Sequence, residues 1–234
     1  MHGFLGSPAD WADMLSSLAP SIACDVISLR ALDCRTVAEF ASAVRDRLRH
    51  DPCDLVVGYS LGGRIALEIC AGDLECAPRL LLLSTHPGIT DATVRQARAA
   101  EDDRRAILLR TLGVASFIEH WYEADLFASF RQHASFATTK ARRVKGDADF
   151  WAGVVAGCSP GRSESRWAAL AAHASNITMA AGGTDARYAA ILRESQASIP
   201  SLRTHLIPDA GHVLPLEAPS ACARLIEAML RQTV

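Results

Sequence analysis

Short apolar runs alternate with longer helical stretches along most of the chain, and this alternation restricts the possible folds more than any other feature. The runs are typical of strands and lie at Ile22–Ser28, Asp54–Tyr59, Arg79–Ser84, Ile177–Ala181 and Leu202–Ile207. Helical patterns cover about residues 8–19, 36–50, 61–71, 187–198 and 217–231. Near-continuous apolar strands suit a parallel sheet covered on both faces. The alternation therefore predicts a mostly parallel, doubly wound α/β sheet.

The middle of the chain interrupts this alternation. Residues 91–170 contain no clear strand and instead show amphipathic helical patterns, such as Thr93–Arg110 and Ala115–Tyr122. Ligands of open α/β sheets bind at the carboxyl ends of the strands. We therefore expect residues 1–90 and 171–234 to form the core and residues 91–170 to form a helical cap over those ends. The alternative is a surface decoration without a role at the site.

The sequence GYSLGG at residues 58–63 carries the strongest chemical signal. It follows a predicted strand and precedes a helical run, which is the context of the G-x-S-x-G nucleophile elbow. Such a turn strains the backbone of the serine and exposes its hydroxyl at the start of a helix. There the helix dipole favours developing negative charge. Ser60 is therefore the predicted active serine.

A reactive serine needs a base. In folds with such a nucleophile elbow, the residues of the triad follow one another along the chain in the order serine, acid, histidine. Asp185 follows one predicted strand and His212 follows the next, so both lie at carboxyl ends of strands, as Ser60 does. In this arrangement His212 takes the serine proton, and Asp185 fixes the tautomer and stabilises the imidazolium. Asp209 is a rival acid, but it lies three residues before the histidine and before the loop.

The first residues of the chain supply a predicted oxyanion hole. His2-Gly3-Phe4 is similar to the HG-x segment that follows an early strand in folds with a nucleophile elbow. The backbone N–H groups of Phe4 and Leu61 are the two predicted donors. We expect His2 to order the loop rather than to transfer protons.

Composition excludes several other classes of function. Net charge is −2, so no basic excess indicates a nucleic-acid partner. No apolar run approaches the roughly 20 residues that span a bilayer, and no signal peptide is evident. The seven cysteines are scattered and odd in number, which indicates thiols in a reducing compartment. We expect a cytoplasmic monomer or small homo-oligomer without metal, cofactor, nucleic-acid or membrane partner.

Several motifs together resemble one enzyme family. They are HGFLG at residues 2–6 with Trp11, GYSLGGRIAL, HPG at residues 86–88, Trp121-Tyr122, GGTDARY and AGH. The chain resembles the 2-succinyl-6-hydroxy-2,4-cyclohexadiene-1-carboxylate synthases, lyases of menaquinone (vitamin K2) biosynthesis with the α/β-hydrolase fold. The resemblance covers nearly the whole chain and is thinnest between about residues 124 and 160.

The resemblance implies both a reaction and a binding site. Members of this family eliminate pyruvate from a cyclohexene that carries an enolpyruvyl group and several carboxylates. The triad abstracts a proton, and no acyl-enzyme is required. By resemblance, Arg64, Arg98 and Arg143 match the arginines that bind the substrate, and Tyr59 and Trp121 match aromatic positions of the pocket.

Simple physics supports part of this assignment. Arg64 follows Ser60 by four residues, about one helical turn, and so lies on the same face. A buried arginine at that position is costly unless an anion meets it. For Arg98 the alternative is a solvated cap helix. For Arg143 the neighbouring Arg142 and Lys145 make the register ambiguous.

Two departures from the family pattern concern the first strands and one loop. The family has a strand or two before HGF, whereas Met1 directly precedes it here. Either the fold lacks its first strands or the true start lies upstream. The loop at residues 29–33 reads LRALD, where the family more often has a DLPGHG-like turn, and this departure bears on the identity of the substrate.

Two other functions remain open on the sequence alone. One is a serine carboxylesterase or carbon–carbon bond hydrolase that acts on a small anionic substrate with Ser60 as a true nucleophile. The other is a non-catalytic binding protein on the same fold. The predicted arginines disfavour the first, and the intact set of Ser60, Asp185 and His212 disfavours the second.

Overall fold

A four-stranded parallel sheet forms the centre of the protein, in a computed structural model that describes residues 1–72 and 78–231. The strands pair side by side in sequence order, β1-β2-β3-β4. They are β1 (Leu55–Tyr59), β2 (Arg79–Leu83), β3 (Ile177–Gly182) and β4 (Arg203–Ile207). Four of the five predicted strands and their parallel pairing are thus confirmed. β2 is almost wholly buried and β3 wholly so, as expected for strands covered on both faces.

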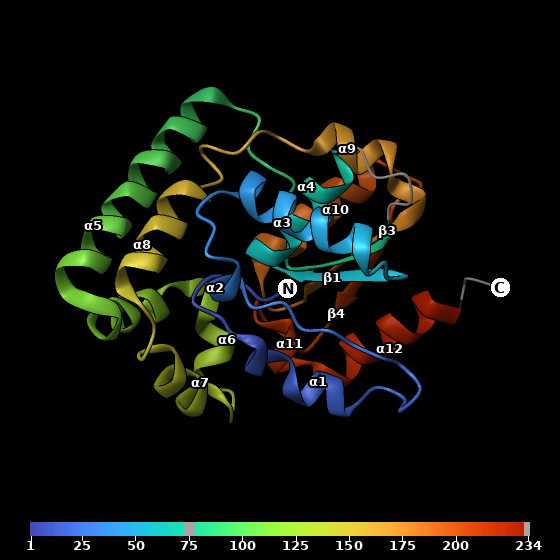
Figure 1. The fold of residues 1–234 in the computed structure, drawn as a ribbon, viewed down its shortest axis with the longest axis horizontal. Helices are drawn as coiled ribbons and strands as arrows, with labels where there is room; N and C mark the ends of the chain where they lie inside the picture. Colours follow the sequence, from blue (N-terminus) through green and yellow to red (C-terminus); the bar gives the residue numbers. More distant parts are fainter. Residues whose placement is uncertain (73–77, 232–234) are drawn as a thin grey trace.

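Helices cover both faces of the sheet (Figure 1). On one side of the sheet lie α1 (Ala12–Ser16) and α12 (Pro219–Arg231), and on the other lie α3 (Val37–His50), α4 (Leu61–Cys70), α9 (Trp167–Ala172) and α10 (Ala186–Ser198). The helices α4, α10 and α12 contact the strands directly. Short elements complete the core: η1 (Pro8–Trp11), α2 (Leu29–Leu32), η3 (Ala174–Asn176) and α11 (Leu214–Glu217). The helix predicted over residues 8–19 is shorter than expected. The helix predicted over 217–231 begins at Pro219, and Glu217 instead ends α11. Proline has no N–H to donate to a preceding turn, so the two helices remain separate.

The middle of the chain forms a helical layer beside this core, on the left of Figure 1. It contains α5 (Ala92–Glu123), η2 (Asp125–Phe127), α6 (Ala128–Arg131), α7 (Phe136–Arg143) and α8 (Ala148–Gly157). The long helix α5 is bent at Gly113, where φ is 73° and ψ is 169°. A positive φ costs glycine little, and this explains why the helical pattern was interrupted between residues 110 and 115. No strand occurs in this layer, as the sequence predicted.

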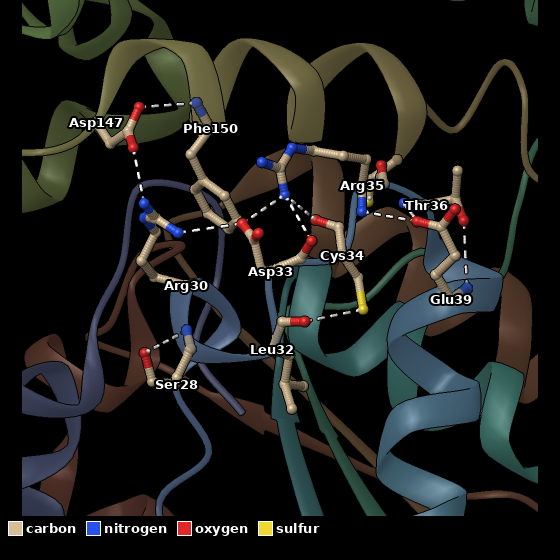
Figure 2. Close-up of polar contacts among 12 residues, drawn as sticks. Ser28, Arg30, Leu32, Asp33, Cys34, Arg35, Thr36, Glu39, Asp147 and Phe150 are labelled. Atoms are coloured by element: carbon tan, nitrogen blue, oxygen red, sulfur yellow. Dashed lines mark hydrogen bonds and ion pairs between the residues drawn. The ribbon is translucent and has the colours of Figure 1, made fainter.

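A loop between α2 and α3 ties the core to α8, as Figure 2 shows. Arg30 forms an ion pair with Asp147, just before α8, at 2.9 Å. Arg35 donates to Asp33 at 3.0 Å. The guanidinium groups of Arg30 and Arg35 lie 4.9 and 4.6 Å from the centre of the Phe150 ring. The LRALD segment thus forms α2 and its C-cap Asp33. Arg30 and Arg35 together carry the ion-pair and cation–π contacts to the helical layer.

The prediction of a strand at Ile22–Ser28 is wrong. The segment is irregular, and Ser28 instead caps α2 by accepting a hydrogen bond from the Ala31 N–H. The physical reason is a missing neighbour. Between this segment and β1 lies a cavity of about 800 Å³, lined by side chains such as Val26 and Val57, so no strand is within pairing distance. In the described residues no strand precedes β1.

Met1 makes the contacts of a strand residue at the edge of this cavity. Its amino group donates to the Val57 carbonyl at 2.7 Å, and its carbonyl accepts from the Tyr59 N–H at 3.1 Å. This pattern is that of a parallel pair, with Met1 opposite Gly58. Burial lowers the pKa of the Met1 amino group to about 5. Met1 thus continues the sheet by one residue beside β1, and the cavity lies along the same edge of β1.

An extended segment added before Met1 should therefore pair with β1. We expect five alternating valine and threonine residues to raise the stability by about 2 kcal/mol after the cost of ordering. For a domain of this size that corresponds to roughly 4–8 °C in the melting temperature. An extension of five glycine and serine residues is the control, because it removes the buried charge without filling the cavity. Equal melting temperatures for the two extensions would contradict the pairing.

Two further observations concern membrane spans and thiols. No helix in the described ranges is long and apolar enough to cross a membrane. Six cysteines are free thiols, among them the buried Cys70, Cys158 and Cys222. The seventh, Cys76, lies outside the described residues.

Candidate active site

Ser60 lies in a strained turn between β1 and α4. Its φ is 53° and its ψ is −109°, a conformation that costs a non-glycine residue on the order of 1–3 kcal/mol. The flanking glycines make the turn possible. A Cβ on Gly58 would lie 2.4 Å from the Gly62 carbonyl oxygen, and one on Gly62 would lie 2.3 Å from the Met1 carbonyl oxygen. The backbone thus has the geometry that the elbow motif predicts.

His212 and Asp185 form a buried pair behind the serine. The imidazole Nδ1 and the carboxylate Oδ2 are 2.8 Å apart, and the two side chains are 4% and 1% exposed. The second carboxylate oxygen accepts the Tyr188 N–H at 3.0 Å. Both residues follow strands, β3 and β4, as expected. The structure thus pairs His212 with Asp185, and the rival acid Asp209 makes no hydrogen bond to the imidazole.

Ser60 and His212 line the same cavity, of about 420 Å³, beneath the helical layer. No direct hydrogen bond joins them in the described part of the chain, as is common before a substrate tightens a site. Aromatic rings hold the imidazole in place. The Tyr188 ring lies 4.5 Å and the Tyr59 ring 5.5 Å from its centre. The imidazole of His212 is thus held in a fixed orientation, and Ser60 lies in a strained turn at the same pocket.

The predicted oxyanion donors lie at the same pocket. Leu61 is the first residue of α4, where a backbone N–H has no acceptor within the helix. Phe4 and Leu61 both line the cavity. His2 accepts the Leu29 N–H at Nε2, at 3.1 Å, and donates from Nδ1 to the Gly3 carbonyl at 2.9 Å. The contacts of His2 therefore order the loop that carries the Phe4 N–H.

This role of His2 makes stability depend on pH. Burial lowers the pKa of His2 to about 4, against an ordinary value of 6.5. Between these values the unfolded chain binds a proton that the folded protein excludes, so stability is lost as the pH falls through this window. We expect thermal unfolding from pH 7 to pH 4 to show a steeper decline for the wild type than for His2→Gln, which keeps an acceptor for Leu29. The lowered pKa of His2 corresponds to about 3 kcal/mol of unfolding free energy. Parallel declines for the wild type and His2→Gln would contradict this prediction.

Arg64 reaches the pocket from the first turn of α4. Its guanidinium donates to the Cys158 carbonyl and to the Ser163 hydroxyl, each at 2.7 Å. No carboxylate in residues 1–72 or 78–231 pairs with it. Burial lowers the pKa of Arg64, which reflects a charge held away from water without a counter-ion. Its position suits the binding of an anionic ligand.

Arg98 lies on the same pocket but already has a partner. It donates to Asp102 at 2.8 Å, and Arg105 donates to the other oxygen of that carboxylate at 2.6 Å. Asp102 is 1% exposed and also lines the cavity. Arg105 also forms an ion pair with Glu101, so Arg98 and Arg105 are balanced by two carboxylates and have less free charge to offer a ligand than Arg64.

Arg143 lines the pocket from within a buried network. It donates to Asp10 at 2.8 Å and to the Tyr122 hydroxyl at 2.7 Å. Burial opposes the charged form of Arg143, but Asp10 outweighs burial and raises its pKa. Arg142 also contacts Asp10. Arg143 therefore joins α7 to η1, and its remaining capacity to bind a ligand is smaller than that of Arg64.

Aromatic side chains form part of the wall of the cavity. The Trp121 ring stacks on Phe117 at 5.7 Å and meets the edge of Phe4 at 5.2 Å. The Arg105 guanidinium lies 5.4 Å from the centre of the Trp121 ring. Tyr59 is buried beside the serine, and burial raises its pKa well above the ordinary value. The predicted aromatic residues Tyr59 and Trp121 thus both face this cavity.

The sequence analysis named neither Asp102 nor Arg187, which line the cavity, nor Asp10, which pairs with Arg143. The two carboxylates stand among other charged residues, so only their burial distinguishes them. Arg187 lines the pocket, and its position two residues after Asp185 in the sequence is the signal that indicates it. No cluster of metal-binding side chains occurs among the described residues.

Comparison with known proteins agrees with this geometry. Residues 1–225 match the family model described as the Alpha/beta hydrolase family. The chain belongs to the alpha/beta hydrolase family. Among solved structures of this fold, MenH from S. aureus aligns with a TM-score of 0.85 and 22% identity, over 99% of this chain and 92% of that one. The expected fold, a mostly parallel sheet with added helices, is thereby confirmed.

Curated relatives within the alpha/beta hydrolase family narrow the resemblance. The 2-succinyl-6-hydroxy-2,4-cyclohexadiene-1-carboxylate synthase of Enterobacter sp. (strain 638) is 28% identical over 99% of this chain and 90% of its own length. The chloroplastic protein PHYLLO of Arabidopsis thaliana is 29% identical over 94% of this chain, but the chain spans only 14% of PHYLLO. The resemblance to the synthases therefore covers nearly the whole chain.

Proposed function

We propose that the protein is a lyase that eliminates pyruvate from 2-succinyl-5-enolpyruvyl-6-hydroxy-3-cyclohexene-1-carboxylate and forms 2-succinyl-6-hydroxy-2,4-cyclohexadiene-1-carboxylate. One observation carries the proposal: the cavity at Ser60 and His212 is lined by arginines, and Arg64 among them has no carboxylate partner in the described residues. Such a pocket favours a substrate with several carboxylates. The synthase names of relatives along the whole chain support the same reaction.

The bond changes follow from the two names. The ring proton at C2 is acidic because it lies next to the succinyl ketone. Ser60 takes this proton while its own proton passes to His212, and Asp185 stabilises the imidazolium. The C2–C3 double bond forms, the C3–C4 double bond moves to C4–C5, and the C5–O bond breaks. The departing enolate takes up a proton and becomes pyruvate, so the enzyme ends unchanged.

The chain's own groups suit the charge that develops in this step. Proton loss at C2 places negative charge on the ketone oxygen, and the N–H groups of Phe4 and Leu61 are the donors proposed for it. Arg64 binds a substrate carboxylate close to the serine. Arg98 and Arg143 contribute less, because Asp102 and Asp10 already take part of their charge. The aromatic wall excludes water, which strengthens each of these interactions.

The test is incubation of the purified protein with the enolpyruvyl cyclohexene while pyruvate is measured by coupled reduction. We expect stoichiometric pyruvate and no adduct in intact-mass spectra of quenched enzyme, since Ser60 acts as a base. A covalent acyl group on Ser60 during turnover would instead support a carboxylesterase or carbon–carbon bond hydrolase. If the correctly folded protein releases no pyruvate from this substrate, the proposed lyase activity is refuted.

A further inference from the structure

The pocket arginines differ in how their charge is balanced. Arg98 and Arg105 share Asp102, and Arg143 pairs with Asp10. Arg187 also lines the cavity, yet it forms no hydrogen bond or ion pair with any residue in the part of the chain that the structure describes. Its side chain is exposed, at the mouth of the cavity rather than in its depth. Arg187 therefore offers the pocket an uncompensated and accessible guanidinium.

The position of Arg187 is unfavourable for the helix that carries it. It is the second residue of α10, two positions after the N-cap Asp185. The start of a helix carries partial positive charge, so a cation there is unfavourable, whereas an anion stabilises it. An anion bound between Arg187 and the helix start would offset this cost. The same holds for Arg64 in the first turn of α4.

His86 adds a neutral donor next to these cations. It follows β2, the neighbour of β3, and lines the same cavity. Its Nδ1 accepts the Gly88 N–H at 2.8 Å, so in the neutral ring the proton is on Nε2. Burial, with Arg187, Arg64 and Arg98 nearby, lowers the pKa of His86 to about 4. At neutral pH the ring is therefore an uncharged donor surrounded by three guanidinium groups.

We propose that Arg187 and His86 form a second anion-binding position of the pocket, which holds one substrate carboxylate at the mouth while Arg64 holds another beside Ser60. The inference rests on the proposed function for the identity of the substrate, but not for the presence of the position. Arg187 determines specificity by requiring a carboxylate at the end of the ligand remote from the serine. It takes no part in proton transfer.

Succinate, a dicarboxylate that cannot react, tests the position directly. We expect isothermal titration to show that Arg187→Gln weakens succinate binding by about 5- to 20-fold. This is the contribution of a hydrogen bond to a charged group, reduced because solvent screens the exposed arginine. Arg187→Lys should recover part of this loss. His86→Asn, which keeps an acceptor for the Gly88 N–H but loses the Nε2 donor, should also weaken binding. The matched control is Arg193→Gln, the same charge change on the exposed side of α10, which should bind as the wild type does.

Kinetics with the enolpyruvyl substrate separate this inference from the proposed function. Arg187→Gln should raise KM with little change in kcat, as for a binding interaction unaltered in the transition state, and its KM should depend less on salt than that of the wild type. If the wild type releases no pyruvate but binds succinate through Arg187, the lyase fails and the anion position stands. If Arg187→Gln and Arg193→Gln bind succinate equally, the anion position is refuted whatever the activity.

Discussion

Ser60→Ala should lower kcat for pyruvate release by about 10²- to 10⁴-fold, the usual contribution of a positioned acid–base group. The fold should remain intact, because alanine removes only the hydroxyl from a half-buried turn. Thermal unfolding provides the check, with a melting temperature close to that of the wild type. Ser60→Gly should be equally inactive but more stable, since glycine tolerates the φ of 53° without strain.

The relay also predicts how losses combine. His212→Ala should cost about as much as Ser60→Ala, and the double variant little more, because the residues act as a unit. Single-turnover measurements on the three variants would show this. Losses that multiply would mean that Ser60 and His212 act in separate steps, and a melting temperature far below that of the wild type would mean that the serine is structural.

Arg64→Ala should lower kcat/KM for the enolpyruvyl substrate by roughly 30- to 4000-fold. Loss of one partner from a desolvated charge pair costs about 2–5 kcal/mol, and 1.4 kcal/mol corresponds to tenfold. Arg64→Lys should recover only part of the activity, because lysine has the charge without the planar fork. Arg98→Ala should lose less, since Asp102 already neutralises part of its charge.

A neutral substrate distinguishes binding from structure in these variants. Arg64 also holds Cys158 and Ser163, so its loss could loosen the segment after α8. If the arginine binds an anion, hydrolysis of a small neutral ester, where it occurs, should be almost unchanged in Arg64→Ala. Equal losses on neutral and anionic substrates would show that the arginine is structural, and the lyase would lose its main physical support.

The sequence predicted those features that depend on local pattern. The strands after which Ser60, Asp185 and His212 lie are short runs with clear ends, so their parallel order brings the three residues to one edge of the sheet. Ile22–Ser28 has an equally strong local pattern but is not a strand, because a strand also needs a neighbour. Pairing is a property of two segments, and the sequence of one segment does not contain it.

Charge compensation was equally hidden from the sequence. Asp10 and Arg143 are separated by 133 positions along the chain and meet only in the folded protein. The resemblance assigned Arg143 to the substrate without reference to this carboxylate. Whether an arginine can bind a ligand depends on which anions already surround it, and that depends on tertiary contacts.

The link between the α2–α3 loop and α8 has a consequence for how such enzymes diverge. Arg30, Arg35 and Phe150 do not line the cavity at Ser60, whereas Val154 and Val155, farther along α8, do. A substitution in the loop would tilt a rigid helix and so change the shape of the cavity at the helix's other end. Selection for a new substrate can therefore act on residues that never touch it, and libraries restricted to cavity-lining positions would miss these routes.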